Sequence, residues 1–114
     1  MLNNTQKNQI ITILKRLDPY KVVLFGSYAK DNENPDSDLD LYVIMKEDYI
    51  PATYKEKIKL KCRVSEVLDP LRFLYPIDLI VHTLPMYEKF KELDSTFFRD
   101  ILHHGVVLYE ADHV

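Results

Sequence analysis

Apolar residues along the chain fall into two patterns, helical spacing and short continuous runs. Positions 10, 13, 14 and 17 recur at the spacing of an amphipathic helix, which Asp18-Pro19 ends. Short apolar runs are typical of strands, whereas apolar positions every three or four residues within polar sequence are typical of helices. The pattern predicts strands at 22–25, 39–45, 77–81 and 106–109, and helices over 51–68 and 85–104, the second broken near Asp94-Ser95.

This order of elements predicts the fold class. Strands alternating with helices indicate an α/β (α+β) layer, a mixed sheet of about four strands with helices packed on it. The strand order cannot be read from one sequence. A length of 114 residues predicts a single domain, 1–114. Pro51 is expected in the first turn of the 51–68 helix, and Gly105 is expected to cap the last helix.

Composition excludes several classes of function. The formal net charge of -3 argues against direct nucleic-acid binding, which needs a basic face. The single cysteine, Cys62, excludes an internal disulfide and a cysteine-based zinc site, and is expected to be packed within its helix. No apolar stretch is long enough to span a membrane, and the polar start lacks a signal-peptide core, so we expect a cytoplasmic protein.

Three carboxylates are the candidates for metal binding. Side chains at i and i+2 of a strand share a face, so Asp38 and Asp40 point one way while Leu39 points into the core. Asp78 interrupts the apolar run 77–81, where a charge is costly unless it is paired, metal-bound or solvent-facing. If strands 39–45 and 77–81 are neighbours, the three aspartates converge. Oxygen ligands favour Mg²⁺ over zinc, and two ions about 3.5–4 Å apart would clamp an in-line phosphoryl displacement.

The Gly26-Ser27 pair is the candidate phosphate-binding turn. Glycine lets the backbone turn sharply after strand 22–25 and approach a ligand, and N–H groups at a helix start attract phosphate. Ser27 can donate to a phosphate oxygen, and Lys30 can neutralise a further phosphate charge. Tyr28 lies within this turn and could contact a base or a partner.

Other polar groups carry weaker signals. His103-His104 diverge around a helix and are expected in its solvated last turn, and His82 lies too far along its strand from Asp78 for a direct role. The alternating cations of the 51–68 helix predict a charged surface that could also dock an acidic partner: Lys55, Lys57, Lys59, Lys61 and Arg63.

The spaced motif resembles that of a known superfamily. Gly26-Ser27, ten residues, then Asp38-x-Asp40 is similar to the Gly-Ser-x10-Asp-x-Asp signature of the polymerase-β-like nucleotidyltransferases, with Asp78 as the third carboxylate. The length and the Gly105–Glu110 ending resemble the minimal nucleotidyltransferase branch, the MntA-type antitoxins paired with HEPN toxins. The family often has glycine where this chain has Asp31.

The resemblance implies a fold, a reaction and a partner. Asp38 and Asp40 would coordinate two Mg²⁺ ions, Asp78 would complete the catalytic ion site and help to activate the acceptor, and Gly26 and Ser27 would hold the triphosphate of ATP. The enzyme would be an Mg²⁺-dependent protein adenylyltransferase that transfers AMP to a hydroxyl, a tyrosine in this branch, of a co-encoded HEPN RNase toxin and releases pyrophosphate. We expect a hetero-oligomer with that toxin, with a second copy as the other possibility.

Two alternatives stay open at this point. The chain could neutralise its partner by binding alone, or it could modify a small molecule or an RNA 3′ end. The second is disfavoured because such enzymes usually carry an extra acceptor domain. The sequence does not identify the acceptor residue, the number of AMP units, the nucleotide preference or the stoichiometry of a complex.

Overall fold

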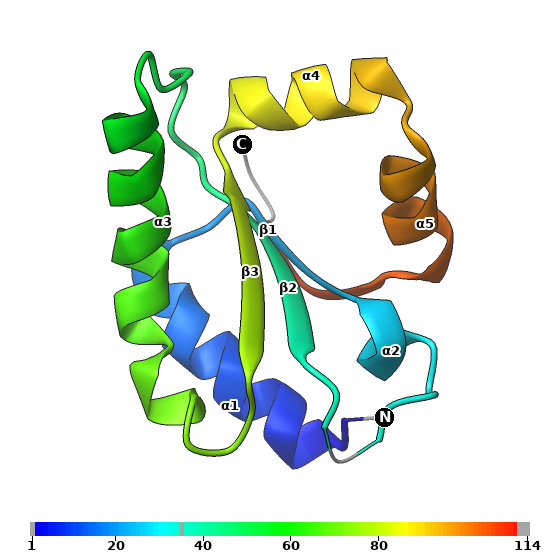
Figure 1. Ribbon diagram of the computed structural model, residues 1–114. Coiled ribbons are helices and arrows are strands. Elements are labelled where there is room, and N and C mark those ends of the chain that lie inside the picture. The colour runs from blue at the N-terminus through cyan, green and yellow to red at the C-terminus, as the bar shows by residue number, and fades with distance from the viewer. Residues whose placement is uncertain (1, 35, 112–114) are drawn as a thin grey trace.

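The fold is built on one mixed four-stranded sheet. The structure, a computed structural model, describes residues 2–34 and 36–111. The strands β1 (Lys21–Phe25), β2 (Leu39–Ile44), β3 (Ile77–His82) and β4 (Val106–Glu110) lie in the order β3-β2-β1-β4 (Figure 1). β1 is antiparallel to both β2 and β4, whereas β2 and β3 are parallel. This confirms the predicted fold class and supplies the strand order that the sequence left open.

Helices surround the sheet. They are α1 (Asn4–Leu14), the single turn α2 (Gly26–Ala29), α3 (Tyr54–Val67), α4 (Leu84–Leu93) and α5 (Thr96–His104), with 3-10 turns at Lys15–Leu17 and Asp69–Leu71. In Figure 1, α1 and α3 lie on one side of the sheet, and α4 and α5 frame the other. Parallel strands need a long crossover connection, and α3 provides it between β2 and β3.

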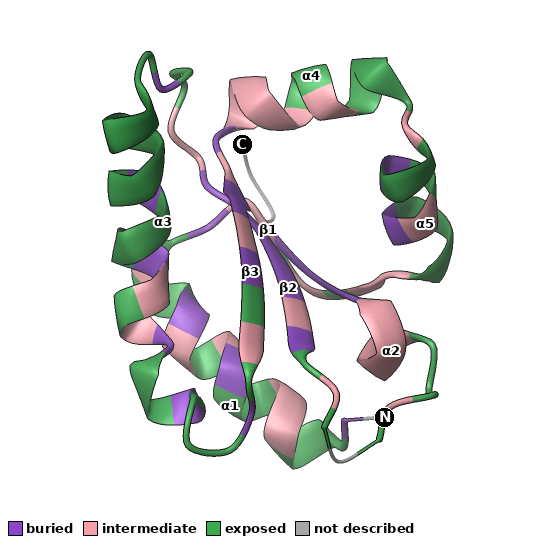
Figure 2. Ribbon diagram, in the orientation of Figure 1, coloured by how far each residue is buried: buried purple, intermediate pink, exposed green. Residues whose placement is uncertain are grey.

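The central strands β1 and β2 are largely buried on both faces of the sheet. Leu39, Leu41 and Val43 of β2 enter the larger cluster with residues of α1 and α3, as the alternation predicted. Tyr42 and Ile44 face the other way, into an aromatic cluster with residues of α4 and α5. Figure 2 shows the central strands buried while the outer side of α3 is exposed. The central strands are therefore largely apolar on both faces, whereas Asp78 of β3 is exposed to solvent.

Local capping decides where the helices begin and end. The break predicted near Asp94-Ser95 is confirmed, because Ser95 caps α5 by accepting the Phe98 N–H at 3.1 Å. The predicted start at Pro51 is wrong: Thr53 accepts the Glu56 N–H and α3 begins at Tyr54.

The predictions for Gly105 and Cys62 have different outcomes. Gly105 caps α5 as predicted and donates its N–H to the Ile101 carbonyl at 2.8 Å, with extended backbone. Cys62 is exposed, so the expectation that it is packed is wrong. Within the described residues, no helix is long and apolar enough to cross a membrane.

Candidate functional site

Asp40 and Asp78 are direct neighbours across the parallel strand pair. The register of β2 and β3 places Leu39 against Ile77 and Asp40 against Asp78. The Leu39 N–H donates to the Pro76 carbonyl at 2.7 Å, which fixes the register where both strands begin. Asp38 is exposed immediately before β2, on the same side as Asp40 by alternation. The condition for convergence of the three aspartates, that these strands be neighbours, is confirmed.

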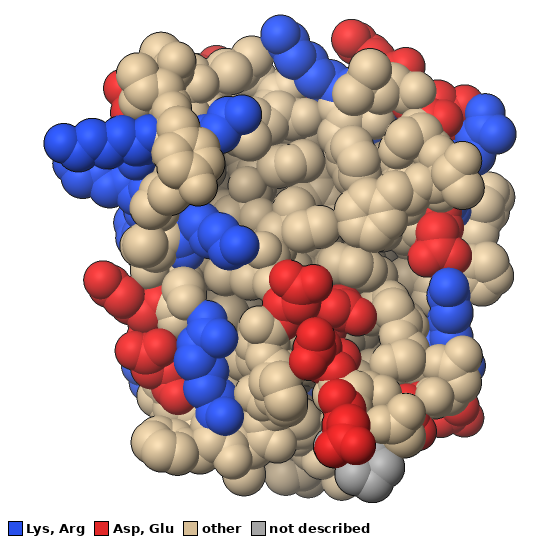
Figure 3. All heavy atoms as spheres, in the orientation of Figure 1, with Lys and Arg blue, Asp and Glu red and all other residues tan. Residues whose placement is uncertain are grey.

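The carboxylates act on one another electrostatically. The pKa of Asp40 is raised from 3.8 to about 6, first because the side chain is partly buried and then because Asp78 and Asp38 repel its charge. Figure 3 shows acidic side chains gathered in the middle of this face, beside a hollow. A cation bound here would relieve the repulsion. Asp38, Asp40 and Asp78 offer carboxylate oxygens, which are the ligands that Mg²⁺ prefers.

The carboxylates are not gathered into a closed cage. Among residues 2–34 and 36–111, no three His, Cys, Asp or Glu side chains stand close enough together to hold a metal ion. The donor chemistry and the repulsion at Asp40 fit a divalent cation. Mg²⁺ needs only one or two protein carboxylates, because it usually keeps several waters and takes phosphate oxygens of a substrate.

Gly26 joins the turn to the carboxylates. It follows β1 with φ of +72°, a conformation that side-chain-bearing residues rarely adopt. A Cβ placed there would overlap the Asp40 carboxylate, whose Oδ2 is its nearest neighbour. The β1–β2 register explains the contact, because Phe25 is paired with Asp40. The Gly-Ser turn and the Asp-x-Asp motif are therefore parts of one site.

Residues after the turn are held by other elements. Gly26–Ala29 forms the expected short helical turn, α2. Lys30 forms an ion pair with Asp100 of α5 at 3.0 Å, and His104 contacts the same carboxylate oxygen at 3.2 Å. Asp31 follows, exposed, with φ of 59°. The structure thus places Lys30 beside the turn and also assigns it a partner that the sequence did not reveal.

Tyr28 points toward the protein interior. Its side chain packs against the larger core cluster, and its ring meets that of Tyr75 edge to face, with 6.2 Å between centroids. A contact from Tyr28 to a nucleotide base therefore has no support in the structure.

His82 shares the face of Asp78 but serves the aromatic cluster. Its Nδ1 lies 2.6 Å from the Tyr42 hydroxyl, and its ring meets the rings of Tyr42 and Phe90 edge to face. Burial, with a smaller contribution from the charge of Lys57, lowers the pKa of His82 from 6.5 to about 4, and burial raises that of Tyr42. His82 is therefore neutral at pH 7. Alternation predicted the face of His82, but only the strand pairing reveals Tyr42 as its partner.

Comparison with known proteins identifies the family. The sequence profile of the polymerase beta nucleotidyltransferases matches residues 8–114. The chain belongs to this family. A protein of Methanocaldococcus jannaschii named "Putative protein adenylyltransferase MJ0141" is 34% identical over 101 residues, covering 88% of each chain.

Solved structures share the fold of this nucleotidyltransferase. A chain of a toxin–antitoxin crystallised with AMP-PNP superimposes with a TM-score of 0.55 at 21% identity, covering 93% of this chain and 74% of that one. A chain from a mutant form of the toxin–antitoxin MntA-HpeT superimposes with a TM-score of 0.59 at 22% identity, covering 98% and 76%. At this identity the likeness establishes the fold, which agrees with the mixed sheet predicted from sequence.

Proposed function

We propose that this nucleotidyltransferase is an antitoxin-type protein adenylyltransferase. The observation that carries the proposal is the parallel register that sets Asp40 beside Asp78, with Gly26 in contact with Asp40. The name of the M. jannaschii relative, at 34% identity, supports a protein as the acceptor. The MntA-HpeT structures share the fold and support a toxin as that protein.

The proposed reaction transfers AMP to a hydroxyl. The acceptor oxygen attacks the α-phosphorus of ATP, the bond from that phosphorus to the bridging oxygen breaks, and pyrophosphate leaves with the electron pair. Asp78 orients the acceptor and takes the hydroxyl proton, directly or through water. Ser27 and the backbone N–H groups of the turn hold the triphosphate, and Lys30 neutralises part of its charge.

Asp38, Asp40 and Asp78 would hold the divalent cations. Mg²⁺ bound there would offset the charge that develops on the phosphate oxygens. The chain supplies carboxylates alone for this purpose, and the raised pKa of Asp40 reflects the repulsion that bound cations would remove. The specific acceptor in this proposal is a tyrosine of a co-encoded HEPN RNase toxin. Modification of that tyrosine would neutralise the toxin.

Neutralisation by binding alone is the second candidate. It is favoured by the absence of a ready-made three-ligand cluster in the described part of the chain and by Asp31 beside the phosphate turn. The two candidates differ in whether the carboxylates are needed.

The test is transfer of the α-phosphate label of ATP to a protein. Purified enzyme, Mg²⁺, labelled ATP and lysate of the native host are incubated, and proteins are separated by size. We expect a labelled band that Asp78→Asn abolishes. Asp48→Asn is the matched control, because Asp48 is an exposed aspartate beyond the opposite end of β2. A band of equal intensity with Asp78→Asn, or protection of cells from the toxin by that variant, would refute the catalytic proposal.

A further inference from the structure

A hollow lies along the free edge of β3. Its volume is about 320 Å³, and it is lined by Lys57, Leu60 and Lys61 of α3, by the β3 residues 79–82, and by Met86 of α4. β3 is the last strand of the sheet on this side, and its outer edge is not paired with another described strand. We call this hollow the β3-edge groove.

The β3-edge groove begins next to the candidate site. Asp78, Ile80 and His82 alternate onto one face of β3. Ile80 lines the groove, and it lies two residues from Asp78, which is roughly 7 Å along a strand. A chain lying in the groove would therefore pass beside the carboxylate assigned to the acceptor hydroxyl.

Two lysines give the groove a positive wall. Lys57 and Lys61 are one helical turn apart, so they project from the same side of α3. Neither forms an ion pair with any described residue, whereas Arg63 on another side of the helix is paired with Glu47. In Figure 3 Lys and Arg side chains gather on the upper part of the α3 side, and acidic side chains lie at the middle of the face and lower on the α3 side. In a chain of net charge -3, this local positive charge favours an acidic ligand at Lys57 and Lys61.

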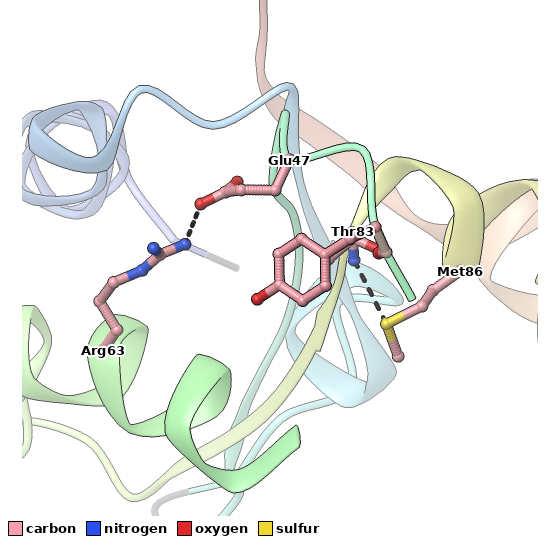
Figure 4. A network of polar contacts seen from close by, with 5 residues as sticks. Glu47, Arg63, Thr83 and Met86 are labelled. Carbon is pink, nitrogen blue, oxygen red and sulfur yellow. Dashed lines mark hydrogen bonds and ion pairs between the residues drawn. The ribbon is translucent and has the colours of Figure 1, made fainter. Parts of the chain in front are cut away.

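Contacts between elements connect the parts of the chain that flank the groove. Figure 4 shows Arg63 of α3 reaching Glu47 after β2, and the Thr83 N–H directed at the Met86 sulfur at 3.5 Å. The Thr83 hydroxyl also donates to the Tyr49 carbonyl at 2.5 Å. These contacts tie α3, the β2–α3 connection and α4 together, and of their residues Met86 also lines the groove.

We propose that the β3-edge groove binds an acidic polypeptide segment of the acceptor protein and presents its hydroxyl to Asp78. This rests on the proposed function. An extended segment can pair with the unpaired backbone of an edge strand while its acidic side chains reach Lys57 and Lys61. The floor favours a polypeptide over a nucleic acid, because Leu60, Leu79 and Met86 are apolar and two lysines are few for tracking a phosphate backbone.

Binding is measured without ATP, using a fluorescein-labelled random copolymer of glutamate and tyrosine and fluorescence anisotropy. We expect the double variant Lys57→Glu/Lys61→Glu to weaken binding at least tenfold. The matched control is Lys55→Glu/Lys59→Glu, which changes the charge equally at exposed sites on another side of the same helix and should alter the affinity less than twofold. Thermal unfolding checks that both variants are folded.

Equal losses in the two double variants, or no loss in either, would overturn the proposal, since both would show that Lys57 and Lys61 have no special role. Tighter, Lys57-dependent binding of a labelled single-stranded oligonucleotide would also overturn it. Transfer of the α-phosphate label of ATP to the copolymer tests the proposed function separately. Asp78→Asn should abolish that transfer, and lysine-dependent binding without any transfer by the unaltered protein would count against the catalytic proposal alone.

Discussion

The α-carbon of Gly26 lies against the carboxylate of Asp40, with no space between them for a side chain. Gly26 belongs to the turn after β1 and Asp40 to the adjacent antiparallel strand β2. The two halves of the family motif therefore meet at this contact. Gly26 is required both by its φ of +72° and by this contact, and the two requirements can be separated experimentally.

We expect Gly26→Ala to lower the free energy of unfolding by about 3 kcal/mol, from the left-handed backbone and the overlap with Asp40. In an Asp40→Ala background the same change should cost about 1 kcal/mol, because only the backbone cost remains. Urea unfolding of the four proteins of this cycle measures both values. Equal costs in the two backgrounds would show that Asp40 does not constrain residue 26.

The raised pKa of Asp40 predicts how stability depends on pH. Between about pH 4 and pH 6 the folded protein keeps a proton on Asp40 that the unfolded chain releases, so this group makes the free energy of unfolding fall as pH rises. After allowance for the partial exposure of Asp40, the free energy of unfolding falls by about 1 kcal/mol over this pH range. Asp40→Asn should remove it, and Asp48→Asn should not. A denaturation series from pH 4 to pH 7 that is unchanged in Asp40→Asn would contradict the repulsion described.

His82 has the opposite effect in nearly the same range. Its pKa is lowered to about 4, so the unfolded chain binds a proton below pH 6.5 that the folded protein does not. Stability from this group is present above pH 6.5 and is lost toward pH 4, by about 2 kcal/mol after allowance for partial exposure. His82→Gln should flatten this acid limb, whereas His103→Gln, at an exposed histidine, should leave it unchanged. If His82→Gln still loses the same stability toward pH 4, groups other than His82 cause that loss.

The Lys30–Asp100 ion pair predicts an effect on nucleotide affinity. In the proposed function Asp100 competes with the triphosphate for Lys30. Asp100→Asn should therefore tighten ATP binding a few-fold in calorimetry, and adding Lys30→Met should abolish the gain. Asp94→Asn, which removes an exposed aspartate paired with Arg99, is the control. Weaker binding by Asp100→Asn would instead show that Asp100 orients Lys30 for the phosphate.

Addition of Mg²⁺ should stabilise the protein more at pH 7.5 than at pH 5. Protonated Asp40 is a poor metal ligand, and its pKa of about 6 lies between these two values. Thermal unfolding with and without millimolar Mg²⁺ measures the difference, with Asp78→Asn as the variant expected to lose it. A shift of equal size at both pH values would indicate that the ion binds elsewhere.

The sequence predicted what depends on local pattern. Four apolar runs became four strands, and alternation correctly placed Leu39, Leu41 and Val43 in the core. The Gly-Ser turn and the break before α5 were also correct, because each follows from the residue present there. The assignment of site residues to metal and nucleotide remains a prediction that geometry supports.

What the sequence did not predict depends on contacts between distant segments. The packing of whole helices and strands decides which strands lie beside β2. The sequence could therefore predict that Asp40 and Asp78 lie side by side only on the condition that β2 and β3 are neighbours. The partners of Lys30 and His82 come from α5 and β2, far along the chain. The errors at Pro51 and Cys62 were local: Thr53 is the stronger helix cap, and position 62 falls on the outer side of α3.

The α3 crossover has a consequence for how the protein is made. β1, the Gly26 turn and β2 can pair as a hairpin-like unit soon after they leave the ribosome, so the contact of Gly26 with Asp40 is available early. Asp78 joins only when α3 has folded and β3 has docked in parallel, a long loop closure that slows assembly. A nascent chain can therefore hold two of the three site aspartates, Asp38 and Asp40, in place before Asp78 joins them. The last of them to join, Asp78, lies two residues from Ile80 of the β3-edge groove.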